Sequence, residues 1–281
     1  MFNPANLLTA LNLIGGCFSI FFTLSGKLDW AIYSLLMCGI FDFFDGFVAR
    51  LLKLNNPIGK DLDSLADVVS FGVAPGIFMM VMIVLGIDQE ALMLDETGRR
   101  MFTGDLNNYV PLQLMGWTRA LIFNEPNFYN ASIKYLPFVG FFIPFISMFR
   151  LAKFNSDTRQ SDQFIGIPTP FNTFFFAFFP LFFVLNLENW GHLNKNIHLL
   201  FDCYVLSAIT VLFSLLMLAN IPMIALKFKD FTWKNNQWKY LFLITSLIAL
   251  LFLKIASIPI IVILYLIFSL INNSQNKPNE V

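Results

Sequence analysis

The feature that most constrains this chain is a succession of apolar stretches, each long enough to cross a membrane. Hydrophobic residues make up 57% of the 281 residues and charged residues only 13%, whereas an ordinary soluble domain is about 25% charged. About 20 consecutive apolar residues suffice for a transmembrane helix. The sequence therefore predicts an all-α, polytopic membrane helix bundle, and its net charge of zero gives no indication of nucleic-acid binding.

About eight spans are predicted within a single integral-membrane domain that covers residues 1–281: six core helices followed by a C-terminal hairpin. The predicted spans are 7–24, 30–54, 61–86, 135–154, 170–187, 199–225, 239–253 and 257–271. The last two form the hairpin, because their continuous apolar run is long for one span and short for two.

Several polar or irregular segments lie between, within or after these predicted spans. Residues 87–134 are expected to be an extramembrane or interfacial insert, whose part 110–123 could lie flat on the membrane, and 272–281 a disordered tail. In the third span, Gly72 and the Pro75-Gly76 pair predict a kink and a close helix contact. Both histidines, His192 and His198, are expected to be solvated loop residues.

Four carboxylates stand beside these apolar stretches. Asp42 and Asp45 are three residues apart on one predicted helix, and Asp63 and Asp67 are four apart on the next, so each pair shares a helix face. A carboxylate at bilayer depth costs about 2.5–3.5 kcal/mol, and four together repel one another. Because oxygen ligands favour hard cations, the cluster predicts a site for two Mg²⁺, Mn²⁺ or Ca²⁺ ions, a device used for displacement at phosphorus.

The residues between the two Asp pairs are compatible with a phosphate ligand. Gly46 and Ala49 are small enough to let a ligand approach the helix backbone, and Gly59 lies where the second helix begins. Arg50 offers a planar fork that matches phosphate oxygens. Metal, phosphate and membrane together indicate a lipid-linked phosphoryl donor.

These residues resemble a known signature, that of the CDP-alcohol phosphotransferase family. The matching pattern is Asp42-x2-Asp45-Gly46-x2-Ala49-Arg50-x8-Gly59-x3-Asp63-x3-Asp67. Within the family, the chain is similar to the membrane-integrated phosphatidylserine synthases, on the segments 63–75, 149–155 and 166–170. The resemblance covers residues 5–86 and 135–270, and it says nothing about the insert. Lys153 and the Phe171-Asn172 pair depart from the expected pattern.

The resemblance implies a fold, a reaction and a set of site residues. The metal ligands would be Asp42, Asp45, Asp63 and Asp67, which would hold two Mg²⁺ or Mn²⁺ ions on the diphosphate of CDP-diacylglycerol. The nucleotide site would comprise Gly46, Ala49, Arg50 and Gly59. Asp67 would also take the proton from the hydroxyl of L-serine, which attacks phosphorus and releases CMP. Family members often form homodimers, so a homodimer is expected.

The acceptor requires a cation that can bind the serine carboxylate. Arg150 and Lys153 lie near the end of the fourth span, at the depth of the Asp cluster, and Asn155 and Thr169 are further candidates. The alternative for Arg150 is a membrane-boundary anchor whose side chain extends to the lipid headgroups.

The distribution of positive charge predicts the orientation. Eleven of the 18 Lys and Arg residues fall on the side that holds the loop between the second and third spans, and the richer side is normally cytoplasmic. The active site is therefore expected to face the cytoplasm, in a bacterial-type cytoplasmic membrane.

Other functions remain open from the residues alone. A sibling enzyme could use glycerol 3-phosphate or an inositol phosphate as acceptor, although a phosphorylated acceptor would call for more basic residues near the site. A divalent-cation transporter would place acidic groups along the depth of the membrane, whereas here they gather at one end of two helices. Charges that merely stabilise a helix bundle, or a catalytically dead binding protein, are the remaining alternatives.

Overall fold

The computed structural model describes residues 3–53, 57–88, 92, 108–123, 133–156, 164–224 and 232–275, and within these residues the chain is almost entirely helical. In chain order the elements are α1 (Pro4–Leu24), α2 (Leu28–Leu51), α3 (Pro57–Asp67), the π-helical turn η1 (Val68–Val73), α4 (Ala74–Ile87), α5 (Tyr109–Phe123), the 3₁₀ turn η4 (Ile133–Phe141), α6 (Phe142–Ser156), β1 (Phe164–Ile165), α7 (Thr169–Asn186), η6 (Leu187–His192), α8 (Lys195–Leu200), α9 (Cys203–Leu216), β2 (Pro222–Met223), α10 (Trp233–Leu253), η7 (Lys254–Ala256) and α11 (Ser257–Gln275).

The chain is an integral membrane protein with an all-α bundle. Six stretches of the described residues are long and apolar enough to cross a membrane. They are Pro4–Leu24, Leu28–Leu51, Ile58–Ile87, Ile133–Ser156, Thr169–His192 and Asn236–Asn273. The expected sixth span, 199–225, is shorter than predicted: its helix α9 has 14 residues. α9 ends at Leu216, whose carbonyl oxygen accepts a hydrogen bond from Ile167 N at 3.4 Å, and the chain then reaches the strand β2 at Pro222.

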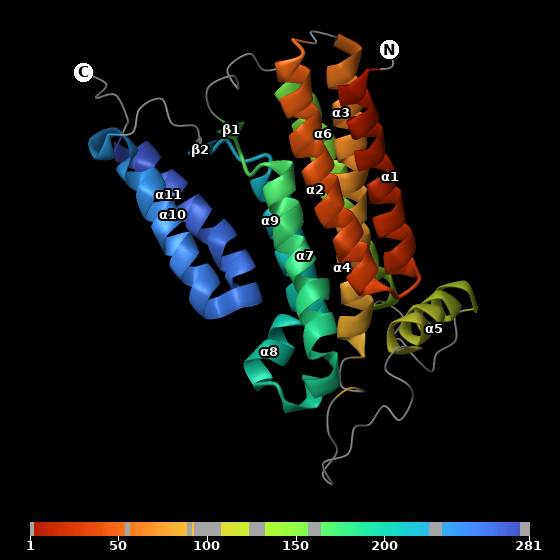
Figure 1. Cartoon of the computed structure of the whole chain (residues 1–281). Helices are drawn as coiled ribbons and strands as arrows, with labels where there is room; N and C mark the ends of the chain where they lie inside the picture. Colours follow the sequence, from red (N-terminus) through yellow and green to blue (C-terminus); the bar gives the residue numbers. More distant parts are fainter. Residues whose placement is uncertain are drawn as a thin grey trace.

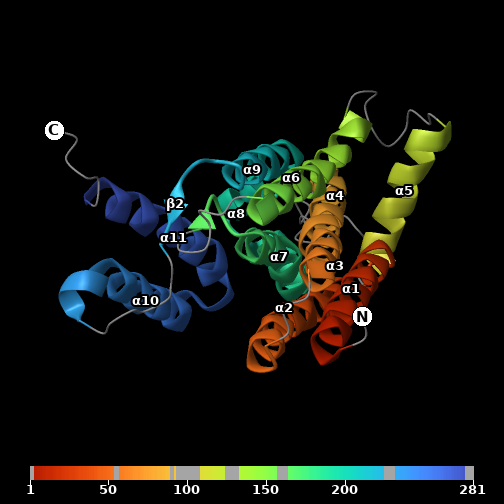
Figure 2. The same ribbon diagram turned by 90° about the horizontal axis from the view of Figure 1, so that it is seen from above.

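The C-terminal apolar run forms the predicted hairpin. α10 and α11 pack against each other and are joined at η7, where Lys254 takes a positive φ of 49°. The hairpin stands beside the main bundle (Figures 1 and 2), and the two termini lie at the same end of the molecule (Figure 1). Helix α11 runs to Gln275, so the first residues of the expected disordered tail are helical, and 276–281 lie outside the described residues.

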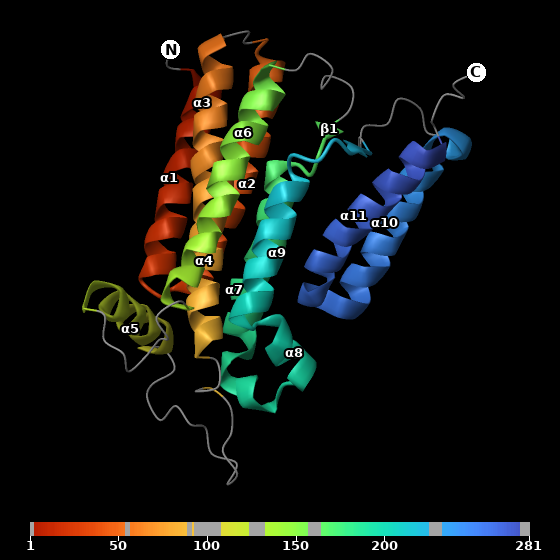
Figure 3. The same ribbon diagram turned by 180° about the vertical axis from the view of Figure 1, so that it is seen from behind.

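The third span contains the predicted irregularity. Between α3 and α4 the chain forms the π-helical turn η1, a feature that often occurs at functional sites. The predicted close contact is also confirmed, because Gly76 lies against the backbone of Gly140 and the ring of Pro144. Figure 3 shows α4 and α6 side by side in this region.

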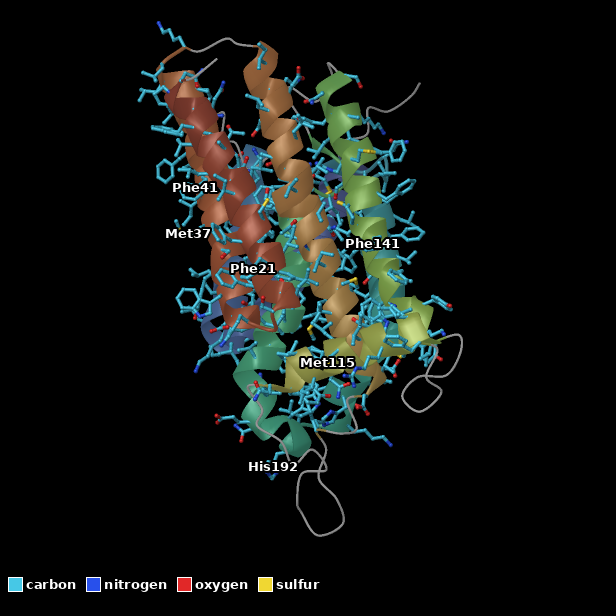
Figure 4. All side chains as sticks on the ribbon, turned by 90° about the vertical axis from the view of Figure 1, so that its right-hand side faces the viewer. Phe21, Met37, Phe41, Met115, Phe141 and His192 are labelled. Carbon is cyan, nitrogen blue, oxygen red and sulfur yellow. The ribbon has the colours of Figure 1, made fainter. Side chains whose placement is uncertain are left out.

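The outer surface of the bundle is apolar. Figure 4 shows Phe21, Met37 and Phe141 directed away from the helices, and each of the three is substantially exposed. Such side chains face lipid when the bundle is in a membrane. The aromatic residues of α7 point inward instead, where Phe175 stacks on Phe213 with ring centroids 3.6 Å apart.

Helix α5 and the histidines lie at the opposite end from the chain termini. α5 corresponds to the expected amphipathic segment and lies across the end of the bundle (Figure 3); most of the rest of the insert is outside the described residues. His192 is exposed, as predicted. The prediction for His198 is wrong: its side chain is buried at 9% exposure against the ring of Trp190, and this desolvation lowers its pKa.

The Gly76–Gly140 contact gives a prediction about stability. A Cβ added at Gly140 would lie 2.8 Å from the backbone nitrogen of Met80. Gly140→Ala should therefore cost about 1–3 kcal/mol through overpacking and lower the unfolding temperature of the purified protein in detergent. Gly116→Ala is the control, because a Cβ at Gly116 meets nothing within 4 Å. Equal unfolding temperatures for the two variants would contradict the close packing.

Candidate active site

Three carboxylates meet where α2 approaches the junction of α3 and η1. α2 runs toward the end of the bundle that holds the chain termini, and α3 returns from it (Figure 1). This antiparallel arrangement places carboxylate oxygens of Asp42, Asp63 and Asp67 within 4.8 Å of one another. Asp67 is the last residue of α3, directly before the π-helical turn.

Asp45, the fourth carboxylate, faces α1. Its Oδ2 accepts a hydrogen bond of 2.7 Å from Thr9 Oγ1, and only 5% of the residue is exposed. Asp45 therefore lies outside the group of three whose oxygens meet within 4.8 Å. Because a carboxylate has a second oxygen, the bond to Thr9 leaves Asp45 able to act as a ligand.

Helix α1 also supports Asp67, through a residue that the sequence reasoning missed. Asn12 Nδ2 donates to Asp67 Oδ1 at 3.2 Å, while the backbone carbonyl of Asn12 accepts from Cys38 Sγ at 3.3 Å. Thr9 and Asn12 are both buried and lie three residues apart on α1, so they share one face. This polar pair within an apolar span is the signal that could have identified them.

The residues of this site fit a hard divalent cation. The converging donors are all carboxylate oxygens, the ligand type of Mg²⁺ and Mn²⁺. One of them, Asp63 Oδ1, is buried without a hydrogen-bond partner, although a buried polar atom is normally paired. A cation among the three carboxylates would supply that partner and reduce their mutual repulsion.

The small residues and the arginine predicted for the nucleotide lie on α2 and α3, the two helices that carry the carboxylates. Beside Gly46 there is open space, because a Cβ built there would meet nothing within 4 Å. Ala49 is half-buried and Arg50 is exposed one residue before the end of α2. Gly59 is half-buried in the first turn of α3.

Arg150 and Thr169 form a buried pair beside the carboxylates. Arg150 Nη1 donates to Thr169 Oγ1 at 2.6 Å, so the Thr169 hydroxyl serves the guanidinium and does not cap α7. Only 7% of Arg150 is exposed, and its Nε is buried without a hydrogen-bond partner. It also lies close enough to Asp67 for an electrostatic interaction.

The other two acceptor candidates make different contacts. Lys153 Nζ donates to Asn220 Oδ1 at 3.0 Å, in an exposed position. Asn155 Nδ2 donates to Ser64 Oγ at 2.7 Å, which ties α6 to α3. The structure therefore brings Arg150 and Thr169 together and directs Lys153 toward the segment before β2.

A hollow of about 700 Å³ lies between α1 and α3, next to the carboxylates. Apart from Asn3, Asn6 and Thr9 at its α1 side, apolar residues line it, among them Leu13, Leu62 and Leu65. Two of its lining residues connect it to the carboxylates: Thr9 donates a hydrogen bond to Asp45, and Ala66 directly precedes Asp67 in the sequence. An apolar hollow that begins at a cluster of carboxylates suits a ligand with a polar head and a hydrocarbon tail.

Comparison with known proteins shows which family the part of the chain that carries this site resembles. The family model described as CDP-alcohol phosphatidyltransferase matches residues 2–93, which contain α1–α4 and all four carboxylates. This part of the chain is therefore similar to the CDP-alcohol phosphatidyltransferases. This family is a family of phosphotransferases, and its members generally use divalent cations.

Several proteins that are similar to this chain are named for serine as acceptor. A CDP-diacylglycerol–serine O-phosphatidyltransferase of Helicobacter pylori is 28% identical over 95% of this chain and 89% of its own length. One from Saccharomyces cerevisiae is 47% identical over 25% of this chain and 28% of its length. An archaetidylserine synthase of Methanothermobacter thermautotrophicus is 42% identical over 26% of this chain, and the match covers 33% of that protein.

The carboxylate cluster predicts metal-dependent stabilisation of the protein. Mn²⁺ at about 100 times its dissociation constant would stabilise the folded protein by about 2.7 kcal/mol and raise its unfolding temperature. Asp63→Asn should abolish most of this rise because it removes one charged ligand. Asp61→Asn is the control, since Asp61 is exposed on the same helix. An equal response to Mn²⁺ in both variants would contradict the assignment of Asp63.

Proposed function

We propose that this protein transfers the phosphatidyl group of CDP-diacylglycerol to the hydroxyl of L-serine, giving phosphatidylserine and CMP. The observation that carries the proposal is the convergence of Asp42, Asp63 and Asp67 inside the part of the chain that is similar to the CDP-alcohol phosphatidyltransferases. The names of the relatives support serine as the acceptor.

The carboxylates would hold the divalent cations. Asp42, Asp45, Asp63 and Asp67 supply four negative charges, which two such ions balance. When bound, the ions neutralise charge on the diphosphate and stabilise the departing CMP. Asp45 is kept in place by Thr9. The site would therefore be organised before the substrate enters, which reduces the reorganisation needed during the reaction.

Asp67 would act as the base. Its carboxylate takes the proton from the serine hydroxyl as the hydroxyl oxygen forms a bond to the phosphatidyl phosphorus. The bond from that phosphorus to the oxygen of CMP breaks, and CMP leaves with the electron pair. The hydrogen bond from Asn12 fixes one carboxylate oxygen of Asp67, which leaves the other for the cation or the proton.

The lipid donor would place its two ends in two parts of the site. The open space beside Gly46, with Ala49, Arg50 and Gly59 around it, would receive the cytidine nucleotide. The apolar hollow between α1 and α3 would hold hydrocarbon of the diacylglycerol, since burial of each CH₂ contributes about 0.8 kcal/mol.

The serine carboxylate would bind Arg150. A guanidinium can donate two parallel hydrogen bonds to a carboxylate, and the unpartnered Nε of Arg150 is a donor still to be satisfied. Its proximity to Asp67 would bring the serine hydroxyl to the base. Thr169 would act by holding the guanidinium. Lys153 and Asn155 would contribute at the edge of the acceptor site.

The membrane orientation and the assembly are part of the proposal. The site lies toward the end of the bundle that holds both chain termini (Figure 1), and the charge distribution favours the cytoplasm for that end. Soluble serine and membrane-held donor would then meet there. The homodimer stays a prediction from the family resemblance.

Two other functions make different predictions. A sibling enzyme would use glycerol 3-phosphate or an inositol phosphate in place of serine. A divalent-cation transporter would move ions across liposomes without lipid turnover. The convergence of Asp42, Asp63 and Asp67 in one cluster favours the enzyme.

Purified protein should release CMP from CDP-diacylglycerol in the presence of Mg²⁺ or Mn²⁺ when L-serine is added, and phosphatidylserine should form in equal amount. Chelation of the metal should stop the reaction. Glycerol 3-phosphate and inositol phosphate are the competing acceptors. CMP release with either of these and none with serine would refute the serine assignment, and ion flux without CMP release would refute the enzyme.

Loss of the guanidinium should affect serine selectively. Arg150→Ala should raise the KM for serine about 10- to 100-fold, the size expected for hydrogen bonds to a charged group, with little change in the KM for CDP-diacylglycerol. Arg150→Lys keeps the charge but loses the planar fork, so its KM should be intermediate. Arg119→Ala, an exposed arginine on α5, is the control. A KM for serine equal to that of the control would remove Arg150 from the acceptor site.

A further inference from the structure

Helix α11 carries a line of polar side chains within an apolar membrane helix. Tyr265, Ser269 and Asn273 are four residues apart, so they lie on one face of the helix. Polar groups at membrane depth are expensive unless they are hydrogen-bonded. All three bond to the short segment that contains β2.

These bonds engage the backbone of β2 and of the residue after it. Tyr265 Oη donates to the carbonyl oxygen of Ile224 at 2.9 Å, and the backbone nitrogen of Ile224 donates to Ser269 Oγ at 3.1 Å. Asn273 Nδ2 donates to the carbonyl oxygen of Pro222 at 2.5 Å. The hairpin therefore holds the segment by its main chain, whatever side chains the segment carries.

The held segment leads directly to two of the acceptor candidates. β2 pairs with β1, where Ile165 lies opposite Pro222, and Gly166 N donates to the carbonyl oxygen of Ile221 at 2.8 Å. Three residues after Gly166 the chain reaches Thr169, which binds Arg150. On the other side, Asn220 precedes β2 and binds Lys153.

Tyr265 makes a second approach to the same region. Its ring packs against that of Phe171 with centroids 4.7 Å apart, two residues after Thr169. Tyr265 and Arg150 also lie close enough to interact electrostatically. The hairpin thus reaches the acceptor side of the site both through β2 and through an aromatic contact on α7.

We propose that the C-terminal hairpin is a working part of the acceptor site, in which Tyr265, Ser269 and Asn273 position β2 and thereby the Arg150–Thr169 pair and Lys153. The proposal deepens the function proposed above and rests on it. The three are positioning residues, because they act through other groups and not on the reacting atoms. They would set the affinity for a small amino-acid alcohol and leave the lipid donor, which binds at α1–α3, unaffected.

The test compares two hydroxyl deletions in the hairpin. Ser269→Ala removes the acceptor for the Ile224 N–H and should raise the KM for serine roughly fivefold, the loss expected for one hydrogen bond, with the KM for CDP-diacylglycerol unchanged. Ser269→Thr keeps the hydroxyl and should restore the KM. Thr245→Val in α10 is the control, because the hydroxyl of Thr245 bonds to carbonyls of its own helix, those of Leu241 and Phe242.

Amide hydrogen exchange tests the structural part independently of turnover. In Ser269→Ala, the amide of Ile224 should exchange faster than in the wild type and in Thr245→Val. Faster exchange with an unchanged KM for serine would overturn the link to the acceptor site, and unchanged exchange would overturn the positioning by the hairpin. A wild-type protein that uses another alcohol in place of serine would instead contradict the proposed function, and the same comparison would then be made with that alcohol.

Discussion

The mutual repulsion of carboxylates in an apolar bundle is the constraint on which the structure depends. Carboxylate oxygens of Asp42, Asp63 and Asp67 lie within 4.8 Å of one another. Asp67 is buried, with only 8% of the residue exposed. Each charge is costly to bury, and the three together are more so. Without a bound cation, bringing the three carboxylates together would destabilise the folded bundle through their repulsion. This cost is the physical reason for proposing the cluster as a cation-binding site.

The surrounding elements can be interpreted as support for that cluster. α1 contributes Thr9 to Asp45 and Asn12 to Asp67, so the first span serves the site although it carries no charge. The π-helical turn follows Asp67 and changes the helix register there, and Thr173 on α7 donates to the carbonyl of Phe71 within it at 2.8 Å. Under the proposed function, packing and catalysis would share the same contacts, and the C-terminal hairpin would extend this support to the acceptor site.

Much of this architecture follows from local sequence patterns, and the rest depends on contacts distant in sequence. The length of the apolar stretches predicted the spans. Gly76 predicted a close helix contact, because a residue without a side chain lets two helix backbones approach each other in a membrane. The fixed spacing of the Asp residues predicted two shared helix faces. Thr9 and Asp45 are 36 residues apart in the sequence, and Ser269 and Ile224 are 45 apart. No periodic pattern in the sequence predicts either hydrogen bond. The shortness of α9 and the burial of His198 depend equally on tertiary packing.

The position of bound Mn²⁺, measured by anomalous diffraction from crystals of the protein grown with the ion, tests most directly whether the carboxylate cluster binds metal. Metal binding at the cluster predicts density for the ion among the carboxylates of Asp42, Asp63 and Asp67, at oxygen-ligand distances of about 2.0–2.2 Å. Asp45 is expected as a further ligand. Ions bound elsewhere in the chain with none at this cluster would contradict metal binding by the three carboxylates.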